Sequence, residues 1–209
     1  MRKRLISKFH VAYHLKRRFV VIFAILLMLL IYFFKNASIV LRVFSAIGFV
    51  VAFYALDHGF DIRFRKRHYA FIFIIAIASF LFSPAYYLYP NYDKIQHFIQ
   101  PILVSSIVFY MISYLNIERK YRLLLAFMVT MGLLGMFEIA EYGLDYLFDL
   151  KLQGVYLREY SGLEKFNLLM DPLDDTMADL LIGIFGSGAY FLGHVFFGKR
   201  YYSKYKNPY

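Results

Sequence analysis

Six long apolar segments limit what this chain can fold into. Most of them reach the roughly 20 residues that an α-helix needs to cross a bilayer. The sequence therefore predicts an all-α integral membrane bundle of six transmembrane helices. Because the first segment is short and follows basic residues, we expect a short or tilted first helix. The segments cover about residues 19–34, 38–60, 69–89, 95–115, 122–148 and 173–197.

The composition excludes several classes of protein. With 61% hydrophobic and 18% charged residues, the chain is too apolar for a soluble domain of its length. It has no cysteine, which excludes disulfides, thiolate metal sites, iron–sulfur clusters and cysteine nucleophiles. It also has no tryptophan, so tyrosine side chains are expected to form the interfacial aromatic belts.

Basic residues predict the orientation in the membrane. Residues 1–18 carry seven Lys or Arg, loop 61–68 carries four, loop 116–122 three and residues 198–209 four. With six alternating helices, these 18 of the 24 basic residues fall on one side, which the positive-inside rule makes cytoplasmic. We therefore expect a multi-pass protein of the cell (plasma or inner) membrane with both termini cytoplasmic. A basic arm (1–18) and a basic tail (198–209) would flank the transmembrane domain (19–197).

The net charge of +10 follows from this distribution. The basic side would contact anionic headgroups, so membrane lipids are the expected partners and nucleic acid is not implied. The N-terminal region resembles a signal peptide, but no convincing small-x-small cleavage site follows, and we interpret it as a retained helix. The residues indicate no particular oligomeric state.

Acidic residues lie where a membrane protein tolerates them least. They occur inside or at the ends of the last three apolar segments, opposite most of the basic residues. Ionisable groups at membrane depth are costly unless they pair, face water or bind an ion, so they mark a functional site. The groups are Asp93 with His97; Glu138, Glu141 and Asp145; and Asp171, Asp174, Asp175 and Asp179.

Asp93 and His97 stand four residues apart at the start of the fourth helix, on one helical face. One interpretation makes Asp93 an N-cap and His97 a buried, hydrogen-bonded histidine. Pro101 complicates this interpretation, because proline cannot donate to the carbonyl of His97 and so frees an acceptor where we expect a kink. Such irregular helix is tolerated at membrane depth where it lines a cavity.

The fifth and sixth helices each add a group of acids. Glu138, Glu141 and Asp145 share one stripe, where they could form an ion-pair network or serve a metal or catalytic role. Asp171 or Asp174 could cap the sixth helix, but capping does not explain the two further carboxylates of Asp175 and Asp179. The candidate cations for an ion-pair network are Lys94, Arg42 and Arg158.

Carboxylates this close together cannot all stay ionised without compensation, which a divalent cation would supply. Oxygen ligands with at most one nitrogen favour Mg²⁺ or Mn²⁺ over Zn²⁺, Ca²⁺ or Fe²⁺. His97 and Asp93 are also the predicted catalytic pair, with His97 as a ligand or as a general acid and base. The predicted metal ligands are Glu138, Glu141, Asp175, Asp179, Asp93 and His97.

Asp57 and His58 lie apart from these groups, near the cytoplasmic end of the second helix. We interpret them as an interfacial cap, or as a salt bridge with the basic run from Arg63 to Arg67.

Three ordered motifs resemble a known family. Asp-Lys-x-x-His-Phe at 93–98, Glu-x-x-Glu at 138–141 and Asp-Thr-x-x-Asp-Leu at 175–180, with glycines after it, resemble the YjdF-type bacterial and archaeal inner-membrane proteins. The same order is more distantly similar to VanZ-like membrane proteins, in which Gln stands at the position of Glu141. The stretch from Asp171 to Asp175 is one residue longer than in the YjdF-type pattern. The resemblance implies a site made of Asp93, His97, Glu138, Glu141, Asp175 and Asp179.

Three functions are compatible with these residues. The first is a metal-dependent hydrolase or transferase that acts on a lipid- or isoprenoid-linked phosphate from the outer leaflet. The second is a proton- or ion-coupled transporter, because intramembrane carboxylates and histidines form proton relays. The third is a non-catalytic membrane protein whose polar residues lock the helices together.

Overall fold

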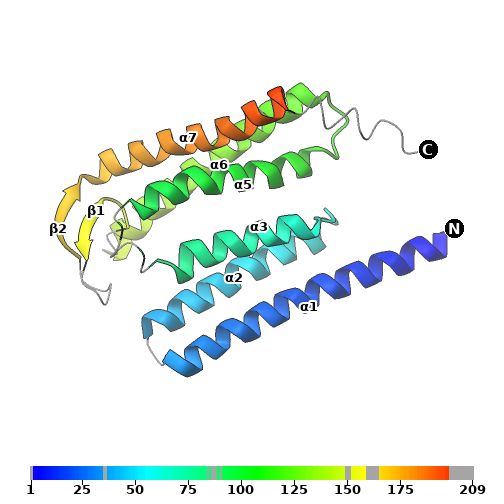
Figure 1. Ribbon diagram of the computed structural model, residues 1–209, viewed down its shortest axis with the longest axis horizontal. Helices are drawn as coiled ribbons and strands as arrows, with labels where there is room; N and C mark the ends of the chain where they lie inside the picture. Colours follow the sequence, from blue (N-terminus) through cyan, green and yellow to red (C-terminus); the bar gives the residue numbers. More distant parts are fainter. Residues whose placement is uncertain are drawn as a thin grey trace. The chain divides into compact units, whose positions relative to one another are not determined.

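The structure is a computed structural model that describes residues 2–34, 37–83, 85, 89, 91–148, 152–158 and 165–197. It divides into two compact units, residues 1–83 and 84–209. Both units are built from helices, and the second also contains a two-stranded sheet (Figure 1). The expected helical fold is confirmed, although the sequence did not predict the small sheet.

The first helix, α1, covers Arg2–Phe34 and is longer than the sequence predicted. We expected a basic arm up to residue 18 and then a short helix, but residues 2–18 belong to the same helix as the apolar segment. This segment contains neither glycine nor proline, and its Lys, Arg and Leu residues are good helix formers. Nothing in the sequence therefore ends the helix at the basic residues.

The first unit continues with α2 (Ala37–Gly59), α3 (Lys66–Ala76) and a π-helical turn, η1 (Ile77–Leu81). Asp57 of α2 is fully buried. One carboxylate oxygen lies 2.7 Å from both Lys16 Nζ and Tyr69 Oη, and the other accepts a bond from the Phe64 amide at 2.9 Å. Asp57 thus joins α1, α2 and α3, and its ion pair with Lys16 was not expected from the sequence.

The second unit contains α5 (Tyr92–Ile112), α6 (Arg119–Phe148) and α7 (Pro172–Phe196), which pack against one another. Between α6 and α7, β1 (Val155–Arg158) pairs antiparallel with β2 (Lys165–Met170), with Val155 opposite Met170 and Arg158 opposite Lys165. The connection over about 149–172 is long enough to act as a lid or a re-entrant cap. The tip of this hairpin, residues 159–164, lies outside the described residues.

Local signals in the sequence explain where these helices begin. Asp171 is the N-cap of α7, where its carboxylate accepts a bond from the Leu173 amide at 2.9 Å, and Pro172 follows at the first helical position. Asn91, not Asp93, precedes α5, so Asp93 lies inside the first turn. Pro101 stays within α5, which continues as one helix to Ile112.

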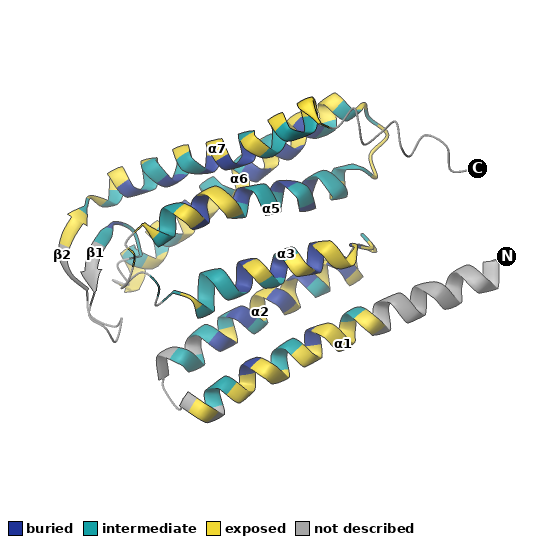
Figure 2. Cartoon of the chain, viewed as in Figure 1, coloured by how far each residue is buried: buried dark blue, intermediate teal, exposed yellow. Residues whose placement is uncertain are grey.

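In the described part of the chain, the three helices α5, α6 and α7 are long and apolar enough to cross a membrane. Figure 2 shows buried and exposed residues interspersed along each of them. Large apolar side chains such as Met136, Ile139 and Phe185 are about 70% exposed, as expected of helix faces in lipid. An integral membrane protein is therefore supported, while the six spans and the cytoplasmic side of the termini stay predictions.

Two glycines of α7 let neighbouring helices approach it closely, Gly186 on the side of α5 and Gly183 on the side of α6. An added Cβ at Gly186 would overlap the backbone carbonyl of Phe98, and one at Gly183 would overlap the side chain of Leu134 and lie 3.7 Å from the carbonyl oxygen of His97. This is the carbonyl that Pro101 deprives of its usual helical donor. The close approach therefore brings the backbone of α5 against α7 within two turns of the acidic residues.

Replacing Gly186 with alanine tests this approach. The added methyl meets backbone atoms, which cannot move without separating the helices, so we expect a loss of about 1–3 kcal/mol in the free energy of unfolding. Gly188→Ala on the same helix is the control, because its Cβ would have nothing within 4 Å. Reversible unfolding in mixed detergent micelles measures both, and equal stabilities would contradict the close packing.

Candidate functional site

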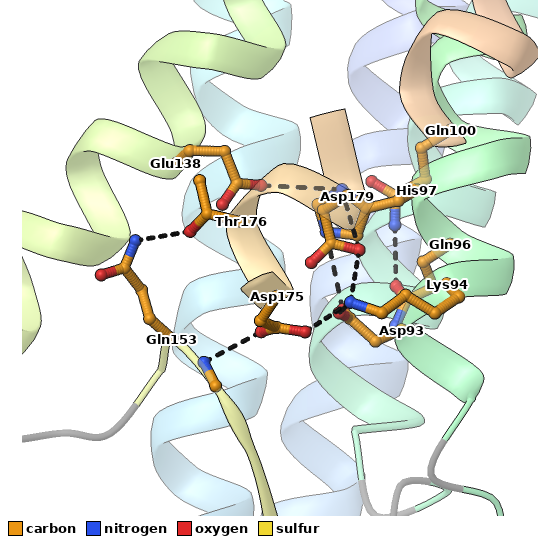
Figure 3. Close-up of polar contacts among 11 residues, drawn as sticks. Asp93, Lys94, Gln96, His97, Gln100, Glu138, Gln153, Asp175, Thr176 and Asp179 are labelled. Carbon is orange, nitrogen blue, oxygen red and sulfur yellow. Dashed lines mark hydrogen bonds and ion pairs between the residues drawn. The ribbon is translucent and has the colours of Figure 1, made fainter. Parts of the chain in front are cut away.

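Lys94 lies at the centre of the acidic residues. Its ammonium group pairs with Asp175 and with Asp179, at 2.8 Å from the Asp179 carboxylate, and lies 3.5 Å from Asp93 (Figure 3). The side chain of Lys94 is 16% exposed, and those of Asp175 and Asp179 are 8% and 4% exposed. A buried ammonium group therefore ties the first turns of α5 and α7 together.

His97 lies one turn deeper along α5, between carboxylates on all three helices. Its Nε2 is 3.5 Å from Asp93 on the same helix, and its Nδ1 is 3.7 Å from Glu138 on α6 and 4.0 Å from Asp179 on α7. The close-up places the imidazole between these groups (Figure 3). We name Asp93, Lys94, His97, Glu138, Asp175 and Asp179 together the polar cluster.

Two buried atoms of the polar cluster lack hydrogen bonds. Among the described residues, neither His97 Nδ1 nor Glu138 Oε1 has a hydrogen-bond partner. The His97 and Glu138 side chains are 9% and 5% exposed, so bulk water does not satisfy them. Buried polar atoms are nearly always satisfied, and an unsatisfied pair points to a bound ion or water between them.

The backbone after α6 covers the start of α7. Asp145 accepts bonds from the amides of Leu152 and Gln153, at 2.6 and 2.8 Å. Gly154, with a φ of 83°, then donates its amide to Asp175 at 2.9 Å. A glycine tolerates this left-handed conformation without steric cost. Asp175 is therefore held from two directions, by this backbone amide and by the Lys94 ammonium.

The structure brings most of the predicted site residues together. One ligand atom each from Asp93, His97 and Asp179 lie within 4.8 Å of one another, a spacing that could hold a metal ion. Glu138 borders His97, and Asp175 pairs with Lys94. Glu141 is half-buried, and within the described ranges no hydrogen bond or ion pair joins it to the polar cluster.

The remaining acids lie outside the polar cluster, and two of them hold the backbone. Asp145 holds the turn after α6 and Asp171 caps α7, while Asp174 is exposed. From the sequence, Asp171 and Asp174 were alternative N-caps of α7. The hydrogen bond from Leu173 now identifies Asp171.

Three residues at or beside the polar cluster were not predicted from the sequence as part of the site. Lys94 was considered only as one of three possible ion-pair partners, and its central position was not predicted. Gln153 and Thr176 were not considered, although their side chains bond each other at 2.9 Å next to Asp175. The available signal for Lys94 was its place next to Asp93, because a basic residue is otherwise rare among these acids.

The arrangement can support two kinds of chemistry. Carboxylates with a single imidazole can hold a hard divalent cation. A histidine between carboxylates can also take up and release a proton. Both kinds of chemistry require buried carboxylates that are ionised or that share a proton. The ammonium group of Lys94 compensates only part of their negative charge.

Replacing Lys94 with methionine tests its place in the polar cluster. Removing one partner of a buried ion pair leaves uncompensated charge and costs about 3–5 kcal/mol. Lys120→Met is the matched control, because Lys120 pairs with Glu118 at the surface, where both side chains are more than 60% exposed. Unfolding free energies in mixed micelles compare the two, and equal small losses would contradict a central role for Lys94.

The comparisons with known proteins give a family and no further match. The model of the family described as "Predicted membrane protein (DUF2238)" matches residues 15–200. No curated protein and no solved structure matches the chain. The expected membrane-protein family is confirmed, in a group that includes YjdF-like families, while similarity to VanZ-like proteins is not shown. The chain belongs to the DUF2238 family of predicted membrane proteins.

Proposed function

We propose that this membrane protein binds one divalent cation between Asp93, His97 and Asp179. With it, the protein would catalyse hydrolysis or transfer at the phosphate of a lipid- or isoprenoid-linked substrate. The observation that carries the proposal is the pair of buried, unsatisfied atoms, His97 Nδ1 and Glu138 Oε1, beside three potential ligands within 4.8 Å.

The charge balance supports a bound cation. The polar cluster has four carboxylates but only one ammonium group and one imidazole. Carboxylates at such spacing either share protons or require further positive charge. A divalent cation would supply this charge, whereas Lys94 alone balances one of the four.

The donor set favours particular ions. Two carboxylates and one imidazole suit Mg²⁺ or Mn²⁺ ahead of Zn²⁺, Ca²⁺ or Fe²⁺. Mg²⁺ prefers six ligands, so three protein ligands would leave positions for water and for a phosphate oxygen. A bound ion of this kind supplies Lewis-acid stabilisation of the negative charge on a phosphate.

The residues around the ion have distinct roles in this proposal. In hydrolysis a water oxygen forms a bond to phosphorus while the bond to the leaving oxygen breaks. Glu138, next to the imidazole, accepts the proton of the water and then returns it to the leaving oxygen. Lys94 at 16% exposure supplies a second positive charge toward the phosphate.

A specific observation favours a second function, a proton-coupled transport pathway. Deeper between the same three helices, Ser105 lies 3.1 Å from the Thr130 hydroxyl and 2.9 Å from the Ser187 hydroxyl. A row of buried hydroxyls beyond a carboxylate–histidine cluster is an arrangement that can pass protons. This function needs no phosphate chemistry, which separates it from the first.

Phosphate release from isoprenoid monophosphates, isoprenoid diphosphates and phosphatidic acid in mixed micelles tests the enzyme. We expect release that depends on Mg²⁺ or Mn²⁺ and falls at least about 100-fold in Asp93→Asn and in Glu138→Gln, the range for loss of a catalytic acid or base. Asp174→Asn, at an exposed acid of the same helix as Asp179, is the control and should keep full activity.

Proton flux into liposomes provides the opposing result. If no phosphate is released from any of these substrates, and proton flux is abolished by Glu138→Gln, the transport pathway would replace the enzyme as the proposed function. Absence of both, with altered stability alone, would leave the polar cluster as a structural lock.

A further inference from the structure

Three buried hydroxyl groups meet at one level between α5, α6 and α7. Ser105, Thr130 and Ser187 are 0%, 2% and 1% exposed. The Ser105 oxygen lies 3.1 Å from Thr130 Oγ1 and 2.9 Å from Ser187 Oγ, and Thr130 Oγ1 lies 2.7 Å from the carbonyl oxygen of Ala126. We name these three residues the hydroxyl triad.

The hydrogen bonds of the hydroxyl triad run in one direction. Thr130 donates to the Ala126 carbonyl and Ser105 donates to Thr130. Because a serine hydroxyl has a single proton, Ser187 must be the donor to Ser105. Each donor is thus used, and the chain starts on α7, crosses α5 and ends on the backbone of α6. A shift of any one helix would leave a buried hydroxyl unsatisfied.

The hydroxyl triad has the same offset from the polar cluster on every helix. Ser105 follows His97 by eight residues, Ser187 follows Asp179 by eight, and Thr130 precedes Glu138 by eight. At 1.5 Å per residue, this separation is about 12 Å along the bundle. Gly186, where α7 meets the backbone of α5, and Gly183, where it meets Leu134 of α6, lie between the two levels. The same three packed helices therefore carry both the hydroxyls and the charged residues.

We infer that Ser105, Thr130 and Ser187 are positioning residues that fix the register and rotation of the three helices, and so hold His97, Glu138 and Asp179 at the spacing of the cation site. Hydrogen bonds are directional, whereas apolar contacts between helices in lipid are not. Apolar contacts alone would therefore determine this spacing less well. The inference rests on the proposed cation site and names the residues that set its geometry.

Two substitutions at Thr130 separate positioning from packing. Thr130→Val keeps the shape but removes the hydroxyl that accepts from Ser105, while Thr130→Ser keeps the hydroxyl and removes a methyl. Electron paramagnetic resonance of free Mn²⁺ measures the dissociation constant in purified protein. We expect Thr130→Val to weaken Mn²⁺ binding about tenfold, as for loss of an outer partner of a metal ligand. Thr130→Ser should stay within about twofold of wild type.

A second readout needs no metal. The ring ¹⁵N resonances of His97, assigned by comparison with His97→Gln, report the protonation and hydrogen bonding of its two nitrogens beside Asp93 and Glu138 in the presence of chelator. We expect these resonances to move in Thr130→Val and in Ser105→Ala, and to keep their wild-type positions in Thr130→Ser.

The two readouts distinguish failure of the inference from failure of the proposed function. Wild-type Mn²⁺ affinity and unchanged His97 resonances in Thr130→Val would overturn the positioning role. If wild-type protein binds no Mn²⁺, the proposed cation site is wrong, and the His97 resonances alone test the positioning role. Resonances that move in Thr130→Val but not in Thr130→Ser would support this role. Resonances that do not move in Thr130→Val would overturn it.

Discussion

The ion pairs of Lys94 with Asp175 and Asp179 are the interaction on which the second unit depends. They join the first turn of α5 to the first turns of α7 in a place where all three side chains are largely buried. Without the ammonium group, Asp93 of α5 would repel Asp175 and Asp179 of α7 where the two helices meet. Further along, Gly186 lets α7 meet the backbone of α5 at Phe98, and His97 comes within 4.0 Å of carboxylates from α6 and α7.

This pairing also changes how the acidic residues are interpreted. From the sequence, a divalent cation was the expected source of positive charge for six ligands. In the structure Lys94 supplies part of that charge, because its ammonium group pairs with Asp175 and Asp179 and lies near Asp93. Asp93, His97 and Asp179 stay close enough to share an ion, while Asp175 serves the ammonium group and the Gly154 amide. The metal site that we propose is therefore smaller than the six-ligand site expected from the sequence, and it has a lysine next to it.

The sequence predicted that acidic groups of three helices meet around His97, but it did not predict which side chains pair between segments. Helical spacing alone placed His97 beside Asp93 and put the carboxylates of α6 and α7 on single stripes. The cap at Asp171 was also foreseen as one of two choices. The central position of Lys94 was not predicted, because its long side chain extends from α5 to acids of α7, and the packing of the two helices determines which acids it reaches. The ion pair of Asp57 was not predicted for a related reason. Its partner Lys16 belongs to a part of α1 that we did not expect to be helical. The hairpin before α7 and the level of hydroxyls likewise appear only when segments far apart in sequence are brought together.

We propose that His97 and its neighbouring carboxylates bind a cation. Electron spin echo envelope modulation of Mn²⁺ added to purified protein tests this proposal, because the modulation detects nitrogen bonded to the ion. We predict the modulation of one imidazole nitrogen, which changes its isotope pattern when histidine is labelled with ¹⁵N and disappears in His97→Gln. Mn²⁺ that binds without nitrogen modulation, or a protein that retains no Mn²⁺, would contradict it and leave the polar cluster to be held by Lys94 and shared protons.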